Sequence, residues 1–206
     1  MENEKGKNPF VDPIIVQDTR ILRPWEYKQF KKGIPKNDFR IAFDAILCSG
    51  MRYSEFYMFQ DNPNWFNENE KKIYLPKVAV RKKKIKRKQR WIRLSDYGAQ
   101  AVTSFFNSDI KLPKRRTWYD NLNRWAESSD ISLEGINIKL TRKTYECWLI
   151  EYFGRKRRTG TEDTDNISAI LLSQGHTRDT AINHYWSLAF TEKDKQEMTY
   201  LMEGWL

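Results

Sequence analysis

Residues 174–186, with the sequence QGHTRDTAINHYW, form the segment around which the rest of the chain is organised, and they hold both histidines of the protein. Gly175 is typical of a helix end, and Thr177 of the residue that caps a new helix. Apolar residues recur at 181, 182 and 185 with helical spacing, so Tyr185 is expected two turns into a short helix whose entry carries His176. Taken alone, the two side chains are better explained as a helix-cap histidine and a core tyrosine.

The composition is that of a folded and strongly basic protein. Of the 206 residues, 39% are hydrophobic and 14% aromatic, which is enough for one domain with a core. The net charge of +10 favours an anionic polymer as partner, because each Lys or Arg laid against a phosphate releases bound counterions. Nucleic acid is therefore the leading partner, and a basic protein with no such partner is the alternative.

Several classes of protein are disfavoured by the same sequence. No stretch approaches the roughly 18 consecutive apolar residues of a membrane helix, so no membrane partner is expected. The charged N-terminus leads into no apolar segment, so no secretory signal is expected. Cys48 and Cys147 lie in apolar helical surroundings and outside any metal-ligand spacing, and the chain has only two histidines, so we expect no zinc site. These features predict a reduced, cytoplasmic protein.

The apolar pattern predicts a mainly helical α+β protein with one small sheet. Residues 1–20 are polar and are expected to form an extended arm. Strands are expected at 73–75 and 91–94 because the pattern changes its period there. Helices are predicted where apolar residues recur at helical spacing behind capping residues, at about 25–30, 37–48, 51–59, 96–106, 118–125, 139–150 and 192–205. The last of these helices can close the core or dock onto a neighbouring protomer.

The two predicted strands flank an unusually basic segment. Eight of the ten residues from Arg81 to Arg90 are Lys or Arg. A charge run is usually a solvated surface, but so many like charges repel one another when no polyanion is present. We therefore interpret this hairpin as a finger that lies against phosphates.

Three further cations stand at unusual places. Arg52 falls at the junction of two buried helices, where a structural ion pair with Glu55 is the simplest explanation. Lys139 and Arg142 fall in the first turn of a predicted helix, where cations oppose the helix dipole unless an anion is bound. This local conflict marks a candidate binding site.

In this order, the polar positions resemble the catalytic domain of tyrosine recombinases, the phage-type integrases, over about residues 21–206. The resemblance rests on an ordered set of short motifs, none of them specific alone. They are Ser49-Gly50-Met51-Arg52-Tyr53-Ser54-Glu55, the basic hairpin ending in Lys88-Gln89-Arg90-Trp91-Ile92-Arg93-Leu94, Lys139-Leu140-Thr141-Arg142, and Ser173-Gln174-Gly175-His176 followed nine residues later by Tyr185.

The resemblance implies a site-specific recombinase that integrates or exchanges double-stranded DNA. Tyr185 would attack a phosphodiester and form a 3′-phosphotyrosyl bond, and no cofactor is needed. Arg52, Arg142 and His176 would hold the non-bridging oxygens, and a hairpin lysine would protonate the leaving 5′-oxygen. Lys84 is our choice for that acid; Lys77, Lys82 and Lys86 remain alternatives.

Two departures from the family pattern stand out. Lys139 occupies the place of the usual histidine, as in archaeal and archaeal-virus members, and the resemblance implies that it contacts the phosphate. The 20 polar residues of the arm cannot supply the usual N-terminal DNA-clamping domain, so we expect a catalytic fragment or a minimal enzyme. The family implies a tetramer on DNA and allows a free monomer. A non-catalytic DNA-binding relative and a topoisomerase-like relaxing enzyme are the alternative functions.

Overall fold

A short β-hairpin begins the described part of the computed structural model, which comprises residues 12–79, 89–158, 170, 173 and 188–205. Strands β1 (Ile14–Val16) and β2 (Thr19–Ile21) pair Ile14 with Ile21, and β2 packs against helix α6 (Leu140–Arg158). Residues 12–20 thus differ from the expected extended arm. The reason is the apolar alternation at residues 14, 16 and 21, which buries one face of the hairpin. The rest of the expected arm, residues 1–11, lies outside the described residues.

Helices make up most of the described chain, as predicted from the apolar spacing. The helices before the middle of the chain are α1 (Pro24–Gly33), α2 (Asn37–Ser49) and α3 (Tyr53–Phe59). They are followed by α4 (Asp96–Phe106), α5 (Arg115–Glu127), α6 and, at the end, α9 (Glu192–Met202). Two single turns of 3₁₀-helix, η1 (Pro63–Trp65) and η2 (Lys77–Ala79), flank part of the sheet.

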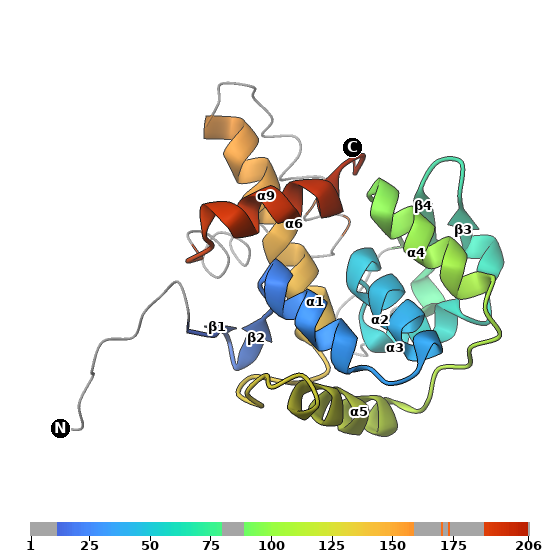
Figure 1. Cartoon of the computed structure of the whole chain (residues 1–206). Helices are drawn as coiled ribbons and strands as arrows, with labels where there is room; N and C mark the ends of the chain where they lie inside the picture. Colours follow the sequence, from blue (N-terminus) through green and yellow to red (C-terminus); the bar gives the residue numbers. More distant parts are fainter. Residues whose placement is uncertain (1–11, 80–88, 159–169, 171–172, 174–187, 206) are drawn as a thin grey trace.

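Helix α2 lies at the centre of the core (Figure 1), where it packs against α4 and α6. Its residues from Ala42 to Ser49 are all buried, and stacked or edge-on aromatic rings extend the core toward α1 and α5. The predicted core residues Trp118, Leu122 and Trp125 are buried on α5. Helix α2 ends where Gly50 adopts the left-handed conformation, with φ at 61°, as the Ser49-Gly50 pair indicated.

A small antiparallel sheet carries the predicted hairpin strands. Its order is β3 (Phe66–Asn67), β4 (Lys72–Leu75) and β5 (Arg90–Arg93). In the pairing of β4 with β5, Ile73 lies opposite Ile92 and Tyr74 opposite Trp91. Ile73 and Ile92 are buried, whereas Trp91 is 55% exposed on the other face. The connecting residues 80–88, which contain most of the basic run, lie outside the described residues.

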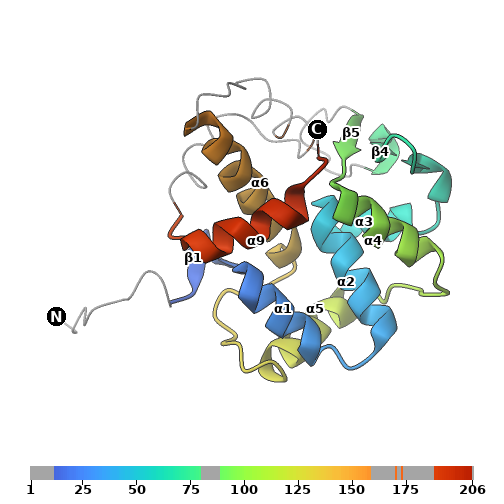
Figure 2. The same cartoon turned by 45° about the horizontal axis from the view of Figure 1, so that its top comes forward.

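Helix α9 closes the core of its own chain. Its predicted apolar residues Met198, Leu201 and Met202 are buried, and Thr191 caps it by accepting a hydrogen bond from the backbone N–H of Asp194. Arg23, just before α1, forms an ion pair of 2.9 Å with Asp194, and both side chains are almost fully buried. In Figure 2, α9 crosses α6 and its C-terminal end approaches α4.

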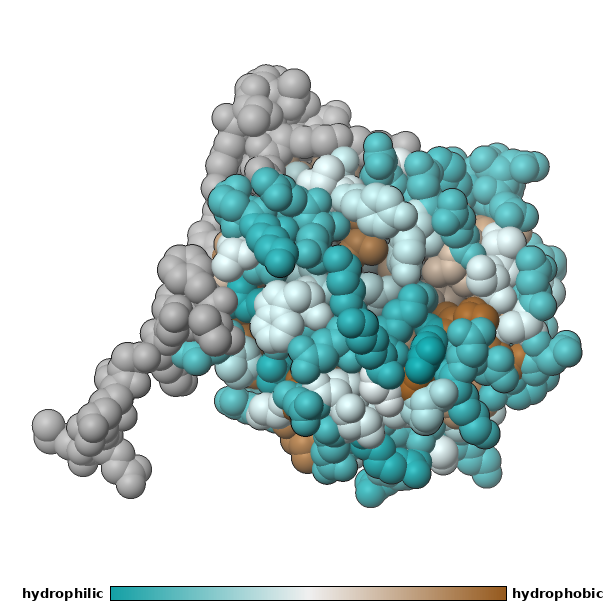
Figure 3. Space-filling model, in the orientation of Figure 1, coloured by the Kyte–Doolittle hydropathy of each residue, from teal (hydrophilic) through white to brown (hydrophobic). Residues whose placement is uncertain are grey.

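The described residues thus confirm the predicted combination of helices with a small antiparallel sheet, to which the β1-β2 hairpin is an addition. Hydrophilic residues cover most of the face shown in Figure 3. Within the described residues, no helix has the length and apolar character that a membrane crossing requires. Cys48 and Cys147 are buried and free, on α2 and α6 respectively.

Candidate functional site

The turn between α2 and α3 fixes the position of Arg52. Gly50 takes the left-handed conformation that ends α2, Met51 is buried, and Arg52 caps the N-terminus of α3 in an extended conformation. Glu55, in the first turn of α3, accepts the backbone N–H of Arg52 at 3.0 Å through Oε2. The backbone of Arg52 is therefore held by the same carboxylate that its side chain contacts.

Glu55 is the centre of an arginine cluster that we define as Arg52, Arg90 and Arg142. Its Oε1 lies 2.6 Å from Nη1 of Arg52, and its Oε2 lies 2.8 Å from Nη2 of Arg90. Nη1 of Arg142 lies 3.9 Å from the same Oε2 and donates a hydrogen bond of 3.1 Å to the carbonyl of Gly50. Three elements, the start of α3, strand β5 and the first turn of α6, therefore converge on one carboxylate.

The cluster is mostly removed from solvent. The side chain of Glu55 is 2% exposed, and those of Arg142, Arg90 and Arg52 are 7%, 9% and 28% exposed. Arg52 thus offers the most accessible guanidinium of the three. A guanidinium has five N–H donors in a fixed planar arrangement. The donors of Arg52 that do not bind Glu55 are suited to hydrogen-bond the oxygens of a phosphate.

The charges in the cluster shift the pKa of Glu55 and that of Arg142. Burial acts to raise the pKa of Glu55, but Arg90, Arg52 and Arg142 outweigh it and lower the pKa to about 2. Burial and the repulsion of Arg52 lower the pKa of Arg142 to about 10, against the opposing attraction of Glu146 and Glu55. Glu55 and Arg142 are therefore both charged at neutral pH.

The arginine cluster carries a net positive charge. Glu146, which is fully buried one helical turn after Arg142, is the second carboxylate in this environment. Among the residues that the structure describes, the three guanidinium groups and the carboxylates of Glu55 and Glu146 sum to +1. Because a buried net charge is costly unless an ion compensates it, the cluster favours the arrival of an anion.

Strand β5 joins the arginine cluster to the segment that precedes His176 in the sequence. Nε of Arg90 donates a hydrogen bond of 2.9 Å to the backbone carbonyl of Ser173, while the other end of its guanidinium binds Glu55. The backbone N–H of Arg93 also donates to Oγ of Ser173, at 3.4 Å. Ser173 is 3% exposed, so this connection is part of the core.

Lys139 lies beside the arginine cluster in sequence but makes other contacts. It is exposed just before α6, and its backbone N–H donates to Oδ1 of Asn137 at 2.9 Å. Its charge acts on Lys143, whose pKa is lowered by burial first and by Lys139 second. Within the described residues, no hydrogen bond or ion pair joins Lys139 to Glu55 or to the cluster.

The remaining predicted site residues lie outside the described residues. They are Lys84, with its alternatives Lys82 and Lys86, and His176 and Tyr185. Lys77, the last alternative, is exposed in η2. Among the residues that the structure describes, no group of three or more His, Cys, Asp or Glu is placed to hold a metal ion.

Sequence reasoning predicted the pair of Arg52 with Glu55 and missed the part played by Arg90. The basic run predicts that Arg90 faces phosphates with the other cations of the hairpin. In the structure its side chain is directed into the protein, where it binds Glu55 and Ser173. The alternation of β5 contained the signal, because Arg90 and the buried Ile92 share one face of the strand while the exposed Trp91 lies on the other.

Comparisons of the chain with models of protein families, with curated proteins and with solved structures gave no match. The assignment of a function therefore depends on the chemistry of the cluster and on the order of the motifs.

Proposed function

We propose that the chain is a tyrosine recombinase that cleaves and rejoins double-stranded DNA through Tyr185. The observation that carries this proposal is the convergence of Arg52 and Arg142, the two arginines that the motifs singled out, on the buried carboxylate of Glu55. They are 90 positions apart in the sequence, and their meeting produces a cationic site of the kind that phosphoryl transfer requires.

The arginine cluster is suited to stabilise the transition state of this reaction. As the nucleophile approaches phosphorus, negative charge grows on the two non-bridging oxygens, and Arg52 and Arg142 would donate hydrogen bonds to them. Glu55 orients the guanidinium of Arg52 and the carbonyl of Gly50 that of Arg142 before the substrate arrives, so little reorganisation is needed during the reaction.

In the proposed reaction, the Tyr185 hydroxyl gives its proton to a solvent water molecule and its oxygen forms a bond to phosphorus. The bond between phosphorus and the 5′-oxygen breaks, and the hairpin lysine, Lys84 in our assignment, donates a proton to that leaving oxygen. The phosphotyrosyl bond conserves the energy of the phosphodiester, so the reverse attack of a 5′-hydroxyl rejoins a strand.

The contact between Arg90 and Ser173 supports the inclusion of His176. His176 is the last residue of the motif Ser173-Gln174-Gly175-His176. Ser173, the first residue of that motif, is held by the same arginine that binds Glu55. A hydrogen bond from His176 to a non-bridging oxygen completes the proposed phosphate site.

A nicked suicide duplex tests the proposal, because loss of a short 5′-hydroxyl fragment traps the covalent intermediate. The protein should shift to a DNA-linked band on a denaturing gel, and Tyr185→Phe should bind the duplex without forming the band. Tyr119→Phe, on α5, is the matched control and should form it normally. Binding without a covalent band in the unchanged protein would favour a non-catalytic DNA-binding protein. Relaxation of plasmids that lack a target site would favour the topoisomerase-like alternative.

A further inference from the structure

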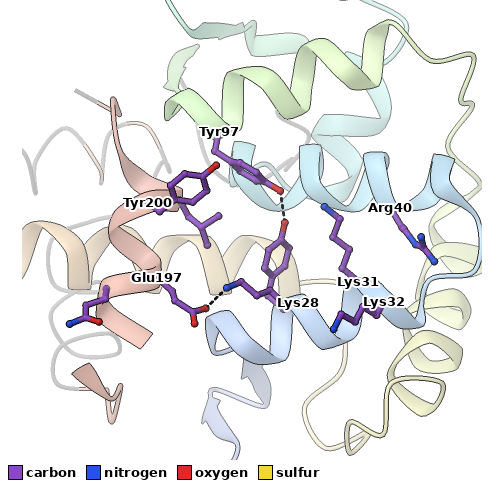
Figure 4. Close-up of a pocket in the computed structure, with 10 residues that line it drawn as sticks. Lys28, Lys31, Lys32, Arg40, Tyr97, Glu197 and Tyr200 are labelled. Atoms are coloured by element: carbon purple, nitrogen blue, oxygen red, sulfur yellow. Dashed lines mark hydrogen bonds and ion pairs between the residues drawn. The ribbon is translucent and has the colours of Figure 1, made fainter. Parts of the chain in front are cut away.

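A groove of about 760 Å³ opens between α1, α2, α4 and α9 (Figure 4). Its volume lies within the roughly 300–1,000 Å³ range of sites that bind small molecules. Its lining includes none of the cluster arginines and neither Glu55 nor Ser173. The groove is therefore a second concave site, separate from the one proposed to bind DNA.

One wall of the groove is aromatic. Tyr97 of α4 and Tyr200 of α9 place their ring centroids 6.3 Å apart, and Tyr200 is 69% exposed. Tyr27 and Leu201 continue this wall into the core and are almost fully buried. An exposed aromatic ring beside a second ring is a surface on which a planar ligand can stack.

A buried hydrogen-bond network fixes the tyrosines of this wall. The hydroxyl of Tyr27 donates to Oδ1 of Asp44 at 2.6 Å, and it lies 2.9 Å from the hydroxyl of Tyr97. Lys31 forms an ion pair with Oδ2 of Asp44. Burial, followed by nearby negative charges including that of Asp44, raises the pKa of both tyrosines. The phenols are therefore neutral, and the wall does not repel an anion.

The opposite side of the groove is cationic. Figure 4 shows Lys31, Lys32 and Arg40 on the side away from Tyr200, and Lys28 directed at Glu197. Lys28 pairs with Glu197 at 2.8 Å, and Lys31 pairs with Asp44. Arg40 donates through Nε to the carbonyl of Ile34 at 2.7 Å.

Two of these cations have no carboxylate partner among the residues that the structure describes. Within the described chain, neither Lys32 nor Arg40 forms an ion pair with a carboxylate. The four cations Lys28, Lys31, Lys32 and Arg40 and the two carboxylates Glu197 and Asp44 sum to +2. A phosphate monoester carries a charge of about −1.5 to −2 at neutral pH and so balances this excess, whereas a single carboxylate balances half of it.

We propose that the groove binds a nucleoside monophosphate, with the base against Tyr97 and Tyr200 and the phosphate against Lys32 and Arg40. The aromatic wall is suited to stack on the base, and Lys32 and Arg40 are suited to bind the phosphate. The volume of the groove is large enough for a nucleoside monophosphate. The same chemistry is offered by a free nucleotide and by the 5′-phosphorylated end of a DNA strand.

Calorimetric titration of the full chain with AMP tests this proposal, with adenosine and inorganic phosphate as partial ligands. AMP should bind one site in 50 mM salt and bind more tightly than either partial ligand. Lys32→Gln or Arg40→Gln should weaken AMP binding about 5- to 10-fold, because each removes a charged partner of the phosphate. Tyr200→Ala should weaken AMP and adenosine binding by a similar factor and leave phosphate binding unchanged.

The control variants separate this site from general attraction and from the arginine cluster. Lys193→Gln removes an exposed charge of α9 that does not line the groove, and Arg52→Ala alters the arginine cluster. Both variants should bind AMP with an affinity within twofold of that of the unchanged protein. Glu197→Gln raises the net charge of the groove to +3 and should tighten AMP binding severalfold.

Four results would overturn the proposal. They are an absence of saturable AMP binding, equal losses of AMP affinity in Lys32→Gln and Lys193→Gln, loss of AMP binding in Arg52→Ala, and tighter binding of an acidic tyrosine-containing peptide than of AMP.

A 5′-phosphorylated trinucleotide distinguishes a free nucleotide from the 5′-phosphorylated end of a DNA strand as the ligand of the groove. Binding of the trinucleotide at least as tight as that of AMP assigns the groove to a DNA end, and weaker binding assigns it to the free nucleotide. Strand cleavage is not required for AMP binding, so either proposal can fail while the other stands.

Discussion

Replacement of Glu55 by glutamine removes the negative charge on which the arginine cluster converges. The folded protein lowers the pKa of Glu55 from its ordinary value of 4.5 to about 2, and the carboxyl is 2% exposed, so solvent screening is slight. At 1.36 kcal/mol for each pH unit, this difference corresponds to about 3 kcal/mol of stability. Glu55→Gln should therefore lower the free energy of unfolding at pH 7 by about 3 kcal/mol.

The pH dependence of this loss gives the sharper test. A carboxyl with a lowered pKa binds protons more readily in the unfolded state, so its contribution is complete above pH 4.5 and disappears as the pH falls to about 2. The difference in stability between the unchanged protein and Glu55→Gln should therefore shrink toward zero over this window. Urea unfolding followed by tryptophan fluorescence at several pH values measures it.

Glu127→Gln, an exposed change at the end of α5, is the matched control and should alter stability by less than about 0.5 kcal/mol at every pH. The reasoning fails if Glu55→Gln behaves like this control. It also fails if the loss at pH 7 persists unchanged at pH 2.5, because the effect would then be one of shape and not of charge.

Three further changes follow from contacts in the described chain. Arg52→Ala should slow formation of the covalent DNA band about 10²- to 10³-fold and cost less stability than Glu55→Gln, because Arg90 and Arg142 still face the carboxylate; a normal rate would exclude Arg52 from the phosphate site. Asp194→Ala leaves the buried guanidinium of Arg23 without this carboxylate and should cost about 3–5 kcal/mol in urea unfolding; a loss below 1 kcal/mol would show that the pair is dispensable. Gly50→Ala forces a residue with a Cβ into the left-handed conformation and should cost about 1–2 kcal/mol; an unchanged stability would contradict the turn described here.

Helix positions and ends were the features most accessible from the sequence. Gly50, Thr191 and the apolar spacing of α2 and α9 act within a few residues, so their effect is visible in the local pattern. The pairing of β4 with β5 was also predictable, because both strands are rich in apolar and aromatic residues.

Features that depend on distant segments were not accessible. The inward direction of Arg90 depends on the carboxylate of Glu55 and on Ser173, which are 35 and 83 positions away from it. The sequence of the β1-β2 hairpin predicts a polar arm because it contains few apolar residues. The hairpin forms because those residues pack against α6, which is distant in the sequence. The groove is lined by residues of four helices, α1, α2, α4 and α9, whose meeting no local pattern reveals.

The most direct test of the proposed DNA strand transfer is identification of the residue that becomes joined to DNA. After a suicide duplex is trapped and digested with nuclease and trypsin, mass spectrometry can examine the peptide of residues 179–193, which contains Tyr185 as its one tyrosine. We expect a nucleotide 3′-phosphate attached to Tyr185. An adduct on a different residue, or no adduct under conditions in which the protein binds the duplex, would contradict the proposed function.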